Sequence, residues 1–283
     1  MAKSTLTLAL FLLPSLISAA CDRGTLSQTA DRYVAAQSLG EIRYIKSLTP
    51  NTTYHEQFRP VPIGTGILAT ALKIDHRRSI YDTTQCASYT ELIVTDKSHP
   101  YVIGTQIWHS ASNSSEIAKI DSIVTDKEDW LFNASHTLYY ALQENWNPIS
   151  PESARDSRAT IQAAGDAYLN LFKGGPGTVD VPWGESCRRL EGGLYTAPGD
   201  TCNSGVPSGV DLVDRRYVID ETLGVVDVFL KFGGGANGSG LPDSHEFRVE
   251  GGKLRFVHTI TACWEKNCGF GDPPEILGTD LGF

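Results

Sequence analysis

The sequence predicts an α+β fold of two tandem units, each built from a helix and a curved antiparallel sheet. The first sign is residues 215–232, where two runs of β-branched and aromatic residues flank a short polar segment that ends at Gly224, the pattern of a β-hairpin. The opening of this hairpin, residues 215–220, aligns without a gap on residues 77–82, which lie 138 positions earlier. A repeat at a fixed spacing indicates a duplicated structural unit.

The helix upstream of each hairpin repeats as well. Asp31 and Tyr33 in the first helix correspond to Asp166 and Tyr168 in the second, 135 positions later. Because the two offsets nearly agree, we expect a unit of roughly 130 residues to occur twice. One helix followed by several antiparallel strands, written twice, is an α+β plan.

The remaining elements are expected from apolar periodicity and from turn residues. Helical segments are expected at residues 25–39, 67–74 and 159–172. Outside the hairpin at 215–232, strands are expected at residues 43–47, 89–94, 101–109, 117–124, 246–249 and 253–264.

The stretch at residues 145–151 contains two prolines and continues neither a helix nor a central strand. We therefore place the boundary between the two units there. The expected division is a signal peptide at 1–20, a first domain at 21–146, a linker at 147–151, a second domain at 152–270 and a tail at 271–283.

Residues 1–20 have the pattern of a secretory signal peptide, with one charge at Lys3, an apolar run from residue 6 to 17, and small residues before Cys21. We expect a secreted protein that is cleaved before Cys21; lipidation of Cys21 is the alternative. No later stretch is long and apolar enough to predict a membrane span. The formal net charge is −9 and Lys and Arg form no block, so we expect no nucleic-acid partner.

The six cysteines form an even set in a chain directed to an oxidising compartment, which predicts three disulfides. Two pairs bracket loops that contain Gly or Asn, and the remaining two cysteines are left for each other. The expected pairs are Cys187 with Cys202, Cys263 with Cys268, and Cys21 with Cys86. A zinc site is the competing interpretation, but no His stands at ligand spacing from either loop pair, so we expect no metal. Four N-glycosylation sequons indicate the same compartment, at Asn51, Asn113, Asn133 and Asn237.

These features resemble a known family. The helix with Asp-x-Tyr, the hairpin at residues 215–232 and the closing strand at 253–263 are similar to the nuclear-transport-factor-2-like, or SnoaL-like, fold. The whole mature chain resembles fungal secreted proteins of uncharacterised function that carry this unit in tandem. The resemblance implies two cone-shaped α+β barrels, each closed around an apolar pocket. The first half departs from the pattern, because its hairpin lacks the Asp-x-x-x-Gly turn and has Cys86 instead.

A polar side chain on an apolar strand face is a candidate for such a pocket. His258 shares its strand face with Phe256 and Ile260, and we expect the opposite face, with Thr259, to be solvated. Asp227 lies on the apolar stripe of the hairpin, where burial would raise its pKa toward acid–base work. Proton transfer by His258 and Asp227 is what the resemblance to SnoaL-like catalysts implies. The alternative is a hydrogen-bonded His and Asp that only stabilise the core.

In the first unit, His109 shares its strand face with Tyr101 and Ile107, which makes it a third candidate for catalysis. Aromatic side chains on the strands are candidates for contacts with a substrate. They are Tyr81, Tyr89, Tyr101, Tyr217, Phe229 and Phe256.

The chain contains no nucleophile elbow, phosphate-binding loop, zinc-protease helix or dinucleotide fingerprint. The SnoaL-like fold hosts dehydratases, isomerases, cyclases and ligand-binding domains. We therefore expect a secreted, cofactor-independent enzyme of secondary metabolism that acts as an isomerase, dehydratase or cyclase on an apolar small metabolite, cycloaddition included. The alternative is a non-catalytic secreted ligand-binding or effector protein. The oligomeric state stays open, with a homodimer as one candidate.

Overall fold

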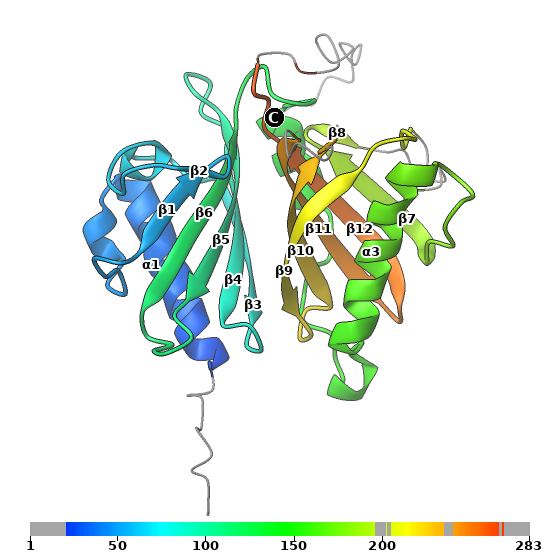
Figure 1. The fold of residues 1–283 in the computed structure, drawn as a ribbon, viewed down its shortest axis with the longest axis horizontal. Helices are drawn as coiled ribbons and strands as arrows, with labels where there is room; N and C mark the ends of the chain where they lie inside the picture. The colour runs from blue at the N-terminus through cyan, green and yellow to red at the C-terminus, as the bar shows by residue number, and fades with distance from the viewer. Residues whose placement is uncertain (1–20, 196–201, 203–204, 235–239, 266–267, 269–283) are drawn as a thin grey trace, which may run out of the picture.

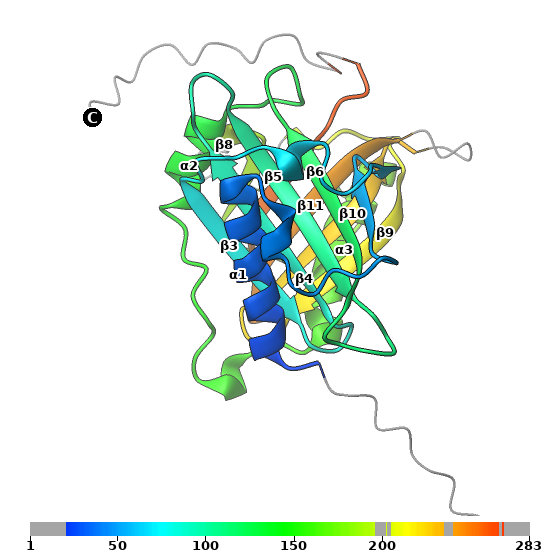
Figure 2. The ribbon, with the colours of Figure 1, turned by 90° about the vertical axis from the view of Figure 1, so that its left-hand side faces the viewer.

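The protein is an α+β molecule with two six-stranded sheets in the part of the chain that the structure describes. The computed structural model describes residues 21–195, 202, 205–234, 240–265 and 268. Four layers follow one another in space (Figure 1): the helix α1 (Arg23–Leu39), the first sheet, the second sheet and the helix α3 (Arg158–Gly174). Figure 2 looks onto α1, which lies across the outer face of the first sheet.

The two sheets have the same strand order. The first runs β2-β1-β6-β5-β4-β3 and the second runs β8-β7-β12-β11-β10-β9. Neighbours are antiparallel except at one pair in each sheet, β1 with β6 and β7 with β12. The strands of the first sheet are β1 (Thr53–Glu56), β2 (Arg59–Pro60), β3 (His76–Asp82), β4 (Ala87–Val94), β5 (Tyr101–His109) and β6 (Ile117–Thr125). Those of the second are β7 (Trp183–Glu191), β8 (Leu194–Tyr195), β9 (Leu212–Asp220), β10 (Val225–Phe232), β11 (Leu241–Glu250) and β12 (Lys253–Thr261).

Each sheet is buried on both faces. One apolar core lies between α1 and the first sheet, with Tyr33 and Ile103, and a second lies between α3 and the second sheet, with Tyr168 and Phe247. The third core joins the halves, because it combines β3 to β6 with β9, β10 and β12 and includes Phe229. The inner faces of the sheets therefore pack on each other rather than facing solvent.

The expectation of two closed, cone-shaped barrels is wrong. In the described residues the edge strands β2 and β3 do not pair with each other, and neither do β8 and β9. Each sheet stays open because its second face is covered by the other sheet. The expected solvated face of β12 is also wrong, since Thr259 is only 3% exposed.

Three local expectations also differ. Residues 43–47 form no strand, and a short 3-10 helix, Ile42–Tyr44, takes their place. The expected helical segment at 67–74 shortens to the 3-10 turn Ile67–Ala69. The helix α2 (Ala134–Ala141), which the apolar pattern did not predict, follows the first sheet and begins at the capping side chain of Asn133.

The two long helices match the sequence prediction because both ends carry capping residues. Asp22 accepts a hydrogen bond from the backbone of Thr25 at 2.9 Å, and Gly40 ends α1 in the left-handed conformation. Ser157 caps α3 in the same way. The face of α3 that carries Tyr168 is buried as expected.

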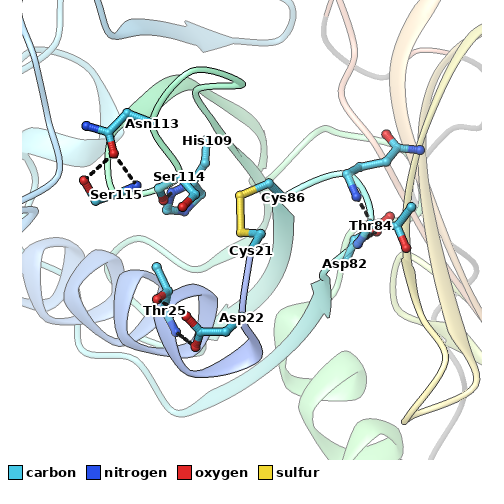
Figure 3. The surroundings of a disulfide bond; sticks show 11 residues. Cys21, Asp22, Thr25, Asp82, Thr84, Cys86, His109, Asn113, Ser114 and Ser115 are labelled. Carbon is cyan, nitrogen blue, oxygen red and sulfur yellow. Dashed lines mark hydrogen bonds between the residues drawn. A yellow bond between two sulfur atoms is a disulfide. The ribbon is translucent and has the colours of Figure 1, made fainter. Parts of the chain in front are cut away.

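The repeated hairpins turn in the same way. Asp220 accepts hydrogen bonds from the backbone of Thr222 and Leu223, and Asp82 accepts the equivalent pair from the first turn. Gly224 has φ +58°, and a Cβ there would meet a backbone oxygen at 2.4 Å, so glycine is required. Cys86 stands 138 positions earlier with φ 54°, and its disulfide to Cys21 anchors that turn to the start of α1 (Figure 3).

The two turn aspartates also bind the opposite half. Asp82 accepts two hydrogen bonds from Arg158, the first residue of α3, at 2.8 and 2.7 Å, and one from the backbone of Ile219 at 2.9 Å. Asp220 in turn accepts from Arg23, the first residue of α1, at 2.7 Å and from the backbone of Tyr81 at 2.9 Å. These reciprocal contacts, which we call the crossed clamps, relate the halves by an approximate twofold arrangement.

The three expected disulfides are present. They join Cys21 to Cys86, Cys187 to Cys202, and Cys263 to Cys268. Disulfides of this number are typical of a protein from an oxidising compartment such as the cell exterior.

Several expectations lie outside the described residues: the signal peptide at 1–20, the tail at 271–283 and the sequon at Asn237. Asn51 and Asn113 are exposed, and Asn133 is partly buried, so these sequons remain predictions. Among the helices in the described part of the chain, none is long and apolar enough to cross a membrane.

Candidate functional site

A pocket of about 460 Å³ lies where the start of β3 faces the segment that follows α2. Most of its lining side chains are polar or charged, which differs from the apolar pocket that we expected. The lining residues are His76, Arg77, Arg78, Ala141, Leu142, Gln143, Glu144, Asn145, Trp146 and Asn147. Arg78 and Glu144 of this lining, together with the buried residues Glu91, Glu246 and His258, form what we call the acid–base cluster.

Arg78 forms the centre of the acid–base cluster. It lies on β3 of the first half, and its Nη2 approaches Glu246 of the second half at 2.5 Å and Glu91 at 2.9 Å. Trp146 covers the guanidinium at 3.8 Å from the ring centre. The arginine side chain is 7% exposed, and burial of such a cation is tolerated only where carboxylates pair with it.

His258 connects the acid–base cluster to the pocket. Its Nε2 lies 2.6 Å from Glu144 Oε2, and its Nδ1 lies 3.1 Å from Arg78 and 3.3 Å from Glu91. Burial disfavours the imidazolium, but the carboxylates of Glu144 and Glu91 outweigh it and raise the pKa of His258 to about 9. His258 is therefore a protonated donor at neutral pH, and it holds one oxygen of Glu144 in place.

The pKa values of the other two carboxylates, Glu91 and Glu246, shift in opposite directions. Burial opposes ionisation of Glu91, yet Arg78 and His258 lower its pKa to about 2. At Glu246 burial prevails over Arg78 and raises the pKa above its ordinary value. The acid–base cluster thus combines a firmly ionised carboxylate with one that takes up a proton more readily.

The two residues predicted for acid–base work lie in one cross-strand row. Asp227 pairs with Glu246 across β10 and β11, and Glu246 pairs with His258 across β11 and β12. Both candidates are buried on an apolar stripe as expected, at 0% and 4% exposure. The stripe faces the first sheet, however, because strand periodicity tells which residues share a face but not which layer covers it.

Asp227 is separated from the pocket. Its carboxylate accepts hydrogen bonds from Gln106 of the first half and from Ser244, both at 2.6 Å. Burial raises the pKa of Asp227 well above its ordinary value. Because Asp227 does not line the pocket, its position between the sheets suits a structural contact better than contact with a substrate.

Glu91, Glu246 and His258 place three potential metal ligands within 4.8 Å of one another. The Nη2 of Arg78 lies 2.5 to 3.1 Å from an atom of each. The guanidinium is therefore the cation that this triad surrounds, and these residues do not fit a metal ion unless Arg78 moves away.

Three buried polar atoms on pocket residues have no hydrogen-bond partner within the described chain. They are Nη1 of Arg78, Oε1 of Glu144 and Nε2 of His76. Burial lowers the pKa of His76, which favours its neutral form. Unpaired buried groups of this kind are costly unless a water or ligand satisfies them. Residues that line the pocket thus carry a donor, a carboxylate acceptor and a neutral imidazole whose buried atoms lack a partner in the described chain.

His109, the third candidate, is buried but lies elsewhere. Its Nδ1 donates to the carbonyl of Ser114 at 2.6 Å, and its backbone bonds to Cys86 at the β3–β4 turn (Figure 3). This turn is at the opposite end of β3 from His76. His109 is therefore not part of the site at the pocket.

The six aromatic residues proposed for substrate contact do not converge, and none lines the pocket. Tyr89 and Phe229 meet edge to face between the sheets, and Phe256 packs on Trp146. The other three lie apart: Tyr81 under Arg23, Tyr101 against His99, and Tyr217 bonded to Asp166.

Sequence reasoning missed most of the acid–base cluster. The Arg-Arg pair at residues 77–78 predicts salt bridges across the sheet rather than a binding site. Glu144 lies in a loop with no periodicity to mark it. Glu91 does carry a signal, since it is the single charged residue of β4, a strand whose residues are all buried. Glu246 carries no such signal, because Asp243, Arg248 and Glu250 stand on the same strand. A buried carboxylate requires a partner of opposite charge, which for Glu91 is Arg78 on the neighbouring strand β3.

A second polar group lies between α3 and its sheet. Tyr168 donates to Glu191 at 3.3 Å, and His245 contacts Asp243, which also accepts from Thr261 at 2.6 Å. All of these side chains are buried, and the alternation of Asp243 and His245 on β11 was the signal that would have found them. These side chains do not line the pocket between β3 and the segment after α2.

Comparison with known families gives one match. Residues 154–261 match the sequence model of a domain of unknown function (DUF8021). This range covers α3 and the strands β7 to β12, and it includes His258 and Glu246 but not Arg78, Glu91 or Glu144. No curated protein matches the chain. The match thus concerns the second half, whereas the lining residues of the pocket all stand before it in the chain, at 76–78 and 141–147.

Proposed function

We propose that the protein is a secreted enzyme that moves a proton on a small metabolite, as an isomerase, dehydratase or cyclase whose acid–base groups are its own side chains. The observation that carries this proposal is the open pocket whose lining residues present an unpaired carboxylate oxygen, on Glu144, and an unpaired guanidinium nitrogen, on Arg78. A base and a positive group at one site are what proton abstraction next to a carbonyl needs.

In the proposed reaction, Glu144 Oε1 takes the proton from a carbon beside a substrate carbonyl. The negative charge that develops on the carbonyl oxygen is stabilised by Arg78 Nη1. In an isomerisation, the proton on Glu144 exchanges with solvent and a solvent-derived proton is added to another carbon. In a dehydration, the proton leaves with the hydroxyl group of the substrate as water. His258 is a positioning residue, since it binds Glu144 Oε2 at 2.6 Å and does not line the pocket.

The polar lining favours a substrate that carries at least one carbonyl or carboxylate group rather than a purely apolar one. Trp146 supplies an apolar wall on one side. We further propose that residues 1–20 direct secretion and that each half is a SnoaL-like unit. The three disulfides support the secreted location.

The test does not require the substrate to be known. Purified protein is incubated with a metabolite extract of its source organism in deuterated water, and mass spectrometry follows deuterium gained at carbon. Wild-type protein is expected to label at least one compound, and Glu144→Gln is expected to reduce that labelling by on the order of a hundredfold or more, the usual size of an acid–base contribution.

The matched control is Glu152→Gln, because Glu152 is 86% exposed and lies outside the pocket. This variant is expected to label as wild type does. Equal labelling by wild type and Glu144→Gln, or none by either, would contradict the proposal. A ligand that copurifies unchanged and gains no deuterium would instead favour a non-catalytic binding protein.

A further inference from the structure

The internal repeat places a second pocket at the position related to the first. It encloses about 390 Å³ between the start of β9 in the second half and the first part of β6 in the first half. It is lined by Phe58, Lys119, Asp121, Asp214, Arg215, Arg216 and Lys231. We call it the basic pocket. Residues 214–216 stand 138 positions after residues 76–78, which line the first pocket, so the two pockets are counterparts.

The basic pocket repeats the plan of the first with other charges. Arg216 reaches the opposite half and meets Asp121 of β6 at 2.6 Å, as Arg78 reaches His258 of β12. An aromatic ring of the first half, Phe58, covers the guanidinium carbon of Arg216 at 5.0 Å, as Trp146 covers that of Arg78.

At the positions equivalent to the acid–base cluster, the basic pocket has other residues. In the cross-strand row, Gln106 and Asp121 of the first half take the positions of Glu246 and His258. Arg216 thus has one buried carboxylate, and it shares Asp121 with Lys119, whose Nζ lies 2.7 Å away. Two cations and one carboxylate leave a positive charge in excess at the floor of this pocket.

The other charged residues of the basic pocket do not cancel this positive charge, because each is paired with an opposite charge. Lys231 pairs with Asp214 at 2.8 Å, and Arg215 pairs with Asp166 outside the pocket at 2.9 Å. The side chains of Lys119, Lys231 and Arg216 are 31%, 29% and 31% exposed, so solvent and solutes reach them. Four cations and two carboxylates thus line one hollow of a chain whose formal charge is −9.

We propose that the basic pocket binds a small oxyanion, the carboxylate or phosphate group of a metabolite, at a site separate from the acid–base cluster. Arg216 and the two lysines supply charged donors, for which carboxylate and phosphate oxygens are the matching acceptors. The Phe58 ring provides an apolar surface for the body of the ligand. A positive hollow on an acidic protein also attracts anions selectively, because the surrounding surface repels them.

The experiment titrates the intact secreted protein with benzoate, with inorganic phosphate and with the neutral benzyl alcohol, by isothermal calorimetry at low salt. We expect saturable binding of at least one anion and none of the alcohol. Benzoate binding identifies an organic carboxylate, and phosphate binding alone identifies a phosphate group. Added salt is expected to weaken the binding, since partly exposed charges are screened.

Lys231→Gln and Lys119→Gln are each expected to weaken anion binding by on the order of tenfold, because each removes a charge-assisted hydrogen bond. Lys173→Gln is the matched control, since Lys173 is a surface lysine, 77% exposed, outside the pocket. Unfolding curves show whether each variant is folded. Absence of saturable binding at millimolar concentration, or equal weakening by Lys173→Gln, would overturn the proposal.

Discussion

At the scale of single residues, the charges buried between the two halves determine how the stability of their contact responds to pH and to mutation. Arg78 from the first sheet is surrounded by Glu91, Glu246 and His258, and each partner depends on the others for its ionisation. Removing one member of such a group leaves an uncompensated buried charge, which lowers the stability of the fold more than replacing the whole group by apolar residues does. The acid–base cluster is therefore sensitive to pH as well as to mutation.

His258 gives a signed prediction for pH. Its pKa is raised from 6.5 to about 9, so the folded state binds the proton more tightly than the unfolded state. The resulting stabilisation, about 3 kcal/mol, is fully present below pH about 6.5 and is lost as the pH rises toward 9. Urea unfolding of wild type and His258→Gln from pH 6 to 10 measures it.

The difference between the two proteins isolates His258, since Asp227 also has a raised pKa and weakens the fold in the same alkaline direction. The free energies of unfolding of wild type and variant are expected to converge as the pH approaches 9. Curves that stay parallel over the whole range would show that His258 is not protonated in the folded protein.

At the scale of elements, the crossed clamps join each hairpin turn to the opposite helix. Asp82 is fully buried, and its carboxylate accepts hydrogen bonds from Arg158, from the backbone of its own turn and from the backbone of β9 in the other half. Because helix, turn and strand meet at one carboxylate, the clamp sets both the register of the turn and the angle of the helix against the sheets.

Asp82→Ala is expected to lower the free energy of unfolding by about 3 kcal/mol or more, because it leaves Arg158 and several backbone amides unpaired. Chemical denaturation at neutral pH measures the loss. Glu152→Ala is the control, since Glu152 is 86% exposed in its pair with Arg155, and such surface pairs contribute about 1 kcal/mol or less. Similar losses in both variants would contradict a special role for the clamp.

At the scale of the whole molecule, the chain resembles a dimer joined into one polypeptide. The contact between the two sheets is an apolar core with charged groups embedded in it. The second half carries both members of a clamp, Asp220 and Arg158, at the positions of Asp82 and Arg23 in the first. Two copies of the second half thus have the groups needed to clamp each other.

We accordingly expect an isolated fragment of residues 152–270 to form a homodimer, because a monomer would expose the apolar face that includes Phe229 and Val225. Size-exclusion chromatography with light scattering measures its mass. Asp220→Ala in the same fragment is expected to weaken the dimer. A stable monomeric fragment would show that the inner face of the second sheet does not need a partner.

The sequence alone predicted the elements that depend on neighbours along the chain. The two long helices, the turn at Gly224 and the alternation around Asp227 and His258 are local patterns with local physical causes, and the structure agrees with them. Six cysteines allow 15 pairings, and the expected one, based on two short loops that each bracket a pair, agrees with the structure. Duplication was visible for the same reason, since a copied hairpin preserves its turn chemistry.

Only the tertiary structure decided what covers each face. Strand periodicity placed Asp227 and His258 on a buried stripe but could not tell a closed cone from a second sheet, because both bury the same residues. Arg78, Glu91 and Glu144 lie far from His258 in sequence and meet it only through packing of the two halves. A site made of charges from several segments depends on this long-range packing, which no local pattern encodes.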